Sequence, residues 1–230
     1  CYNCALEPTF TLAISPPAGS LCAPASSQHN VAVASIQGFT NNVTLSASGL
    51  PAGVSAYFST NPVTPPGNST LTLDVAGAAA GEYPILITGT SGAIVRSATV
   101  TLSVYTAPPV PPTLTFPANG QLSAPVRPIF TWNPAPFATS YAIQVARDPA
   151  FSNIVASASG LTSPSFQPAA DLLQGKLHYW RVQASNACGT GAWSSPFYFT
   201  TRVTPAVLLV DDDDNGPNVR SLYTQALTSL

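Results

Sequence analysis

The sequence predicts an all-β protein of two antiparallel β-sandwiches in tandem, followed by a short C-terminal strand–helix piece. Short runs of alternating apolar and polar residues recur along most of the chain, and turns rich in Gly and Pro separate them. The 230 residues include 24 Pro and 15 Gly, while 45% apolar residues are enough to build cores. A Pro cluster, TAPPVPP, separates two series of such runs near the middle of the chain.

The first predicted sandwich spans residues 8–106, and residues 1–7 are interpreted as the tail of a preceding domain. Seven alternating runs, from FTLAISP to AIVRSATVTLSV, are separated by turn signals such as PPAG and NPVTPPGN. Seven short strands fit the strand count of an immunoglobulin-like sandwich. Because side chains alternate between the two faces of a strand, we expect these apolar residues to face inward: Leu12, Ile14, Val31, Val33, Val43, Leu45, Leu71, Leu73, Ile85 and Ile87.

Residues 107–112 form a Pro-rich linker, which favours an extended, semi-rigid spacer. The second predicted sandwich spans residues 113–203, with strands in PIFTWNP, SYAIQVARD and the hairpin sequence LHYWRVQASNACGTGAWSSPFYFT. Strand parity assigns four large residues to its core: Trp132, Tyr141, Trp180 and Val182. Trp193 and Tyr198 lie on the far side of the hairpin and are candidates for an exposed binding surface.

Residues 204–230 are interpreted as the start or stub of an α/β element, because a buried strand (PAVLLV), an acidic turn and an amphipathic helix follow one another. The acidic turn contains Asp211, Asp212, Asp213 and Asp214 and is a candidate site for Ca²⁺ or Mg²⁺, since both ions prefer oxygen ligands. Against a metal, the run lacks alternating calcium-loop spacing, and a helix N-terminus favours acids by itself. No other cofactor is expected.

The four cysteines are Cys1, Cys4, Cys22 and Cys188. A zinc site would need a second pair of ligands, so disulfides in an oxidising compartment are the prediction. Four cysteines allow three pairings. The favoured one is Cys4–Cys22, which would pin the lead-in to the first strand and leave Cys188 free or paired with Cys1 across the domains.

Composition argues against several functions. Seven Lys and Arg residues are too few and scattered to form a nucleic-acid groove, and no apolar run is long enough to span a bilayer. His29 and His178 fall on strands of different sandwiches, and neither lies beside a nucleophile with an orienting acid. Paired acids for glycoside hydrolysis are also lacking. The sequence therefore predicts that this chain has no enzymatic activity of its own.

Two stretches resemble known families. The pattern W-x8-Y-x-I-x-V, followed by L-x5-H-Y-W-R-V-x-A-x-N-x-C-G-x-G-x-W-S, resembles bacterial secreted fibronectin type III domains, although His178 stands at the family's corner tyrosine position with Tyr179 beside it. Gly38 to Gly53 and Asn61 to Gly67 are similar to Ig-like repeats. The tandem resembles the accessory region C-terminal to the catalytic domain of large secreted bacterial peptidases, often metallopeptidases.

This resemblance implies a secreted, monomeric, non-catalytic accessory and spacer region of a bacterial hydrolase. Its partners would be the catalytic domain of the parent chain and a polypeptide or polysaccharide substrate. The spacer would position that catalytic domain near its substrate or a cell surface. The alternative is an adhesive or carbohydrate-binding module that acts through exposed loops and aromatic residues.

Overall fold

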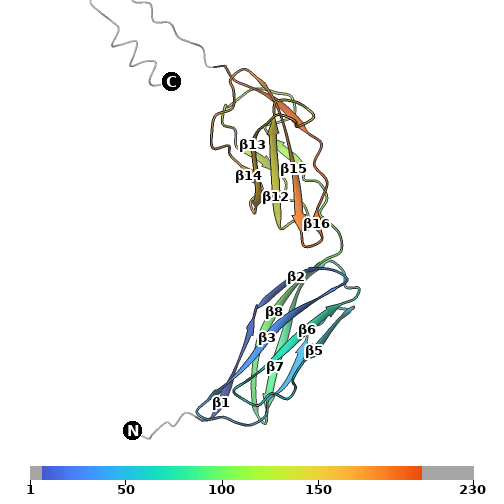
Figure 1. Ribbon diagram of the computed structural model, residues 1–230, viewed down its shortest axis with the longest axis vertical. Coiled ribbons are helices and arrows are strands. Elements are labelled where there is room, and N and C mark those ends of the chain that lie inside the picture. Colours follow the sequence, from blue (N-terminus) through green and yellow to red (C-terminus); the bar gives the residue numbers. More distant parts are fainter. Residues whose placement is uncertain (1–6, 204–230) are drawn as a thin grey trace, which may run out of the picture.

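The computed structural model describes residues 7–203, which form two antiparallel β-sandwiches arranged end to end (Figure 1). The predicted all-β fold class is confirmed. Residues 1–6 and 204–230 lie outside the described residues, and so do Cys1, Cys4, the Asp211–Asp214 turn and the predicted C-terminal strand–helix piece. Within residues 7–203 there is no helix that meets the length and apolarity of a membrane span.

The first sandwich has immunoglobulin topology. Its strands are β1 (Thr9–Ser15), β2 (Ala18–Cys22), β3 (Ala25–Ile36), β4 (Thr44–Ser48), β5 (Val54–Phe58), β6 (Gly67–Val75), β7 (Gly81–Ser91) and β8 (Ile94–Tyr105). One sheet has the order β1-β3-β6-β5 and the other β2-β8-β7-β4. These orders reproduce the ABED and CFG sheets of an immunoglobulin domain, with β2 added in parallel beside β8.

In the second sandwich, a three-stranded sheet faces a larger one. Its strands are β9 (Leu114–Phe116), β10 (Gln121–Ala124), β11 (Phe130–Trp132), β12 (Ser140–Ala146), β13 (Ile154–Leu161), β14 (Ser165–Phe166), β15 (Leu177–Asn186), β16 (Gly189–Thr190) and β17 (Phe197–Thr201). The small sheet has the order β14-β11-β9. The large one runs β10-β17-β15-β12-β13, and β16 pairs with the end of β15.

Each sandwich has its own core, and strand parity predicts most of its members. Eight of the ten inward positions expected in the first sandwich are buried, whereas Leu12 and Ile14 are only partly buried against the core. In the second sandwich Trp132, Tyr141, Trp180 and Val182 are all buried. The Trp180 indole packs against the Phe130 ring, with ring centroids 5.0 Å apart.

One strand of the first sandwich differs from the sequence prediction. The sequence predicts a turn at PPAG, but β2 begins at Ala18, directly after Pro16 and Pro17. The two prolines move the chain from the edge of one sheet to the edge of the other, since β1 pairs with β3 and β2 pairs with β8. The structure therefore has eight strands here instead of seven.

Candidate functional site: a disulfide-linked junction between the sandwiches

A disulfide between Cys22 and Cys188 joins the two sandwiches covalently. Cys22 is the last residue of β2, and Cys188 lies in the turn between β15 and β16. The two Cα atoms are 4.7 Å apart although 166 positions separate them in sequence. In Figure 1, β2 lies at the end of the first sandwich that faces β16 of the second.

This pairing corrects the predicted Cys4–Cys22 disulfide, and it also replaces the expectation that Cys188 is free or paired with Cys1. The physical reason is the direction of β2. Thr9 of β1 pairs with Ile36, whereas Cys22 pairs with Tyr105, the last residue of β8. β1 and β2 thus carry the chain along the sandwich, so Cys22 faces the second domain and not the lead-in to the first strand.

Asn186 positions Cys188 and ties three segments together. Its Oδ1 atom accepts a hydrogen bond from the backbone N–H of Cys188 at 2.8 Å, within the tight turn that joins β15 to β16. Its Nδ2 atom donates to the carbonyl oxygens of Ala107, at 3.0 Å, and Phe137, at 3.2 Å. One side chain therefore connects the hairpin, the linker and the loop before β12.

Asn186 is not among the site residues that the sequence predicts. Asparagine two positions before another turn residue is a signal for a local side-chain-to-backbone hydrogen bond, and this signal fits Asn186 and Cys188. The contacts with Ala107 and Phe137 join residues 79 and 49 positions apart, so no local pattern indicates them.

The linker lies against the hairpin. Gly191 N donates to Ala184 O at 2.9 Å, which keeps the segment after β16 alongside β15. A Cβ atom on Gly191 would overlap the carbonyl oxygen of Pro109, so the absence of a side chain lets the linker pass close to the hairpin. At the far end of the linker, Asn133 N donates to Thr113 O at 2.8 Å.

A shallow groove of about 290 Å³ follows the linker at this junction. Its lining is largely apolar and includes Tyr105, Pro108, Pro109, Pro136 and Phe137. The Phe137 side chain is 54% exposed, and its backbone has a positive φ of 59°, which non-glycine residues rarely adopt. The backbone at the groove is thus held in an unusual conformation next to the Asn186 contact.

The predicted surface aromatic Trp193 is half-buried because a cation covers it. The Arg181 guanidinium lies 4.5 Å from the centroid of Trp193 and 4.0 Å from that of Phe151. Gln144 Oε1 accepts from Arg181 Nε at 3.0 Å and from Nη2 at 2.7 Å. Desolvation lowers the pKa of Arg181. The stacked side chains of Phe151, Arg181 and Trp193 therefore form a ladder on the outer face of the sheet.

The loop after β12 holds Phe151 in this ladder. The Asp148 carboxylate accepts three backbone N–H groups, from Ala150, Ser152 and Asn153, at 2.7 to 3.1 Å. The N–H groups of Ser152 and Asn153 are the main cause of a lowered Asp148 pKa, because they stabilise the charged form.

By contrast Tyr198, the other predicted surface aromatic, is 46% exposed and lies beside Tyr179.

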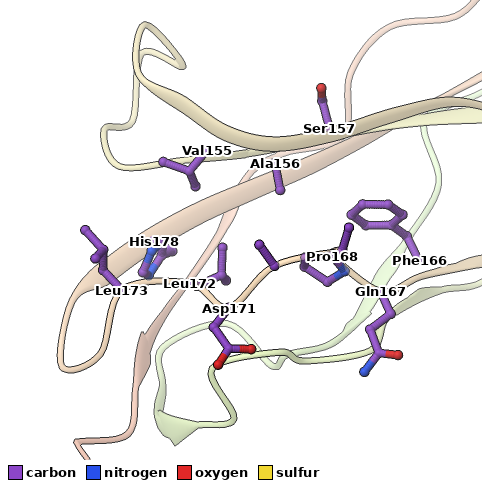
Figure 2. A pocket seen from close by; sticks show the side chains of 12 residues that line it. Val155, Ala156, Ser157, Phe166, Gln167, Pro168, Asp171, Leu172, Leu173 and His178 are labelled. Atoms are coloured by element: carbon purple, nitrogen blue, oxygen red, sulfur yellow. The ribbon is translucent and has the colours of Figure 1, made fainter.

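His178 lines a half-open cleft of about 390 Å³ in the second sandwich, shown in Figure 2. The polar groups of this cleft do not converge, because Ser157 points to one side and Gln167 and Asp171 point to the other. His178 is fully buried, stacks on Phe199 with centroids 5.5 Å apart, and donates from Nδ1 to Lys176 O at 2.9 Å. The imidazole thus makes a backbone hydrogen bond near the corner position.

His29 has a structural environment in the first sandwich. Its Nδ1 donates to Pro16 O at 2.7 Å, so Nε2 is left to accept from the Ser27 hydroxyl at 3.0 Å. The orienting group is a carbonyl, not a carboxylate, and only 1% of His29 is exposed. Among residues 7–203, no group of three or more His, Cys, Asp or Glu side chains is arranged to hold a metal ion.

Comparisons with known proteins give weak similarity to sandwich tandems. No protein family matches the chain, and no curated protein sequence does. Domains A168–A170 of titin align with 14% identity and a TM-score of 0.43, over 85% of this chain and 66% of the titin fragment. Chicken CNTN1 FN1–FN3 domains align with 15% identity and a TM-score of 0.34, over 81% of this chain and 65% of theirs.

The fibronectin(III)-like modules of Clostridium thermocellum CbhA align with 14% identity and a TM-score of 0.35, over 84% of this chain and 94% of theirs. This chain thus spans just under two thirds of the titin and CNTN1 fragments. With TM-scores below 0.5, these similarities add nothing to what the strand order of the chain itself shows: an immunoglobulin-type sandwich followed by a second, fibronectin-like one.

Proposed function

We propose that this chain is a non-catalytic accessory and spacer region of a secreted bacterial hydrolase, of the peptidase class, that holds a catalytic domain at a fixed position. The observation that carries the spacer role is the Cys22–Cys188 disulfide. Disulfides persist in oxidising compartments, which supports secretion. The peptidase setting rests on the sequence resemblance of the tandem.

Two covalent connections restrain the domains more than one does. A linker alone leaves two domains free to bend and to twist about it, and free relative motion is the usual expectation for small interfaces. The disulfide joins the same two sandwiches at a second point, which removes twist about the linker. The remaining bend about the two connections is opposed by Asn186, whose Nδ2 holds Ala107 and Phe137.

The site geometry also supports a non-catalytic role. The imidazoles of His29 and His178 both use Nδ1 to donate to a backbone carbonyl, and both side chains are buried. The adhesive alternative is weakened at Trp193, because Arg181 already occupies one ring face. A sugar ring stacks on an open aromatic face, which leaves Tyr198 as the remaining predicted platform.

Interdomain distance measurements test the spacer. Spin labels attached through non-cysteine chemistry at Ser46 and Ser159, exposed residues of β4 and β13, report the distance between the sandwiches by double electron–electron resonance. We expect a narrow distribution in the oxidised protein and a broad one after reduction. A label pair within the first sandwich, at Thr11 and Ser46, should give the same width in both states. A broad distribution in the oxidised protein would exclude a rigid spacer.

A further inference from the structure

The disulfide shortens the covalent path between the two ends of the chain, because it joins two positions that are far apart in sequence. Cys22 and Cys188 are 166 positions apart, so residues 23–187 form a closed loop that contains β3 to β15. Within the described chain, residues 7–21 and 189–203 lie outside this loop. A tension applied between the two ends passes through these two segments and across the sulfur–sulfur bond.

The two segments outside the loop run lengthwise along their sandwiches. In the first, Thr9 pairs with Ile36 at one end and Cys22 pairs with Tyr105 at the junction, so β1 and β2 advance in one direction. In the second, the hairpin turn at Cys188 lies at one end of β15, and Thr200 pairs with Leu177 at its other end. Figure 1 shows β1, β2 and β16 in succession along the long axis.

This route has little slack. Strands already rise about 3.2–3.4 Å per residue, close to the limit of about 3.3–3.6 Å for a fully extended chain. β1, β2 and β17 supply about half of the described path, and stretching these strands adds little length. By contrast, the 166 positions enclosed by the disulfide correspond to about 560 Å of extended chain. A tether without the disulfide would release that length when its sandwiches unfold.

We propose that the disulfide makes this tandem a tether of limited extension, in which force applied along the chain bypasses the backbone of β3 to β15, while β1, β2 and β17 remain in the path of the force. The cores are held by hydrogen-bonded ladders and apolar packing, which yield under load long before a covalent bond does. Because the load passes through Cys22 and Cys188, strands β3 to β15 carry no tension through their backbone. Reduction of the disulfide places the whole chain under load.

This inference goes beyond the proposed spacer role, which requires only a fixed geometry in the absence of force. Either proposal can be wrong while the other is right. The bypass depends on which cysteines are joined. The spacer depends on how narrowly the junction confines the two sandwiches at rest. A broad interdomain distance distribution would remove the spacer and leave the bypass intact.

Single-molecule force spectroscopy on the full 230-residue chain tests the bypass, with handles attached to both termini through peptide tags. The closed loop of residues 23–187 leaves 65 residues, both cysteines included, in the path of the force. In the oxidised protein we expect total extension to stay below about 220 Å, the length of about 65 extended residues. In Cys22→Ser/Cys188→Ser we expect about 560 Å more, released in at least two steps.

Two further measurements serve as controls for this test. Cys1→Ser/Cys4→Ser keeps the disulfide and should extend like the wild type. If Cys22→Ser/Cys188→Ser fails to fold, adding dithiothreitol while the wild type is held under load should release the same about 560 Å. Steps of that length in the oxidised wild type would overturn the proposal. Peptide mapping that found Cys22 joined to Cys4 would also overturn it.

Discussion

The side-chain oxygen of Asn186 lies 2.8 Å from the backbone nitrogen of Cys188 and accepts its hydrogen bond. This contact fixes the turn that presents Cys188 to Cys22, while the amide of the same side chain holds the linker at Ala107. The covalent junction and the non-covalent one therefore share a residue. Disturbing Asn186 should loosen the resting geometry without removing the disulfide.

We expect Asn186→Ala to lower the free energy of unfolding of the second sandwich by about 1–2 kcal/mol, because three hydrogen bonds of a half-buried side chain are lost. Urea titration of the oxidised protein measures the change. The matched variant Asn186→Asp keeps the acceptor for Cys188 but turns a carboxylate oxygen toward the carbonyl oxygens of Ala107 and Phe137, so it should also be less stable than wild type. Equal stability of all three proteins would show that the contacts contribute nothing.

A second prediction concerns the close approach of the hairpin to the linker. A Cβ atom at Gly191 would overlap the carbonyl oxygen of Pro109, where backbone meets backbone and neither yields easily. We expect Gly191→Ala to destabilise the protein by about 1–3 kcal/mol, the range for overpacking, and to broaden the interdomain distance distribution. Gly77→Ala is the control, because a Cβ atom there meets nothing within 4 Å. If both variants behave alike, the linker does not lie against the hairpin.

Strand parity is a local property, which is why the core was predictable and the junction was not. The alternation of Val31 and Val33 or of Trp180 and Val182 is visible in a few consecutive residues, and all four are buried. The five residues of β2 carry no mark of the sheet they join. Their pairing with β8 places Cys22 beside Tyr105, 83 positions away, so the disulfide partner followed from topology alone.

The same difference between local patterns and long-range contacts applies to the candidate site. The sequence places Trp193 on the far side of the hairpin, but the ring of Phe151 and the guanidinium of Arg181 come to it from two other segments. Phe151 reaches the ladder through a loop held by the Asp148 carboxylate, with a positive φ of 58°. A residue in an unusual backbone conformation leaves no alternating pattern to detect, so the ladder was missed.

This ladder gives a third prediction. Arg181→Lys keeps the positive charge but loses the planar group that stacks between Phe151 and Trp193 and the paired hydrogen bonds to Gln144. We expect a loss of about 1–2 kcal/mol in the free energy of unfolding. The Trp193 fluorescence emission should move to longer wavelength as the ring gains solvent. Because Trp132 and Trp180 are buried, that shift should be absent in Arg181→Lys/Trp193→Phe.

The last prediction concerns the pH dependence of stability. Desolvation of the buried imidazole lowers the pKa of His178. The hydrogen bond to Lys176 raises it by less, and the positive charge of Arg147 adds a smaller lowering effect. Nδ1 already donates to Lys176 O, so protonation would add an N–H at Nε2, which is buried without a partner. The folded state therefore favours the neutral ring.

The sign follows from proton counting. Below about pH 6.5 the unfolded chain protonates this histidine while the folded protein resists, so stability falls as pH decreases from 6.5 toward the lowered folded-state pKa. One proton gives at most about 1.4 kcal/mol per pH unit. Unfolding titrations at pH 7.5, 6.5, 6.0 and 5.5 should show a smaller decrease in His178→Asn, in which the Asn amide is meant to replace Nδ1 as donor to Lys176. Identical slopes in the two proteins would mean that His178 gains its proton equally in both states, contrary to its burial.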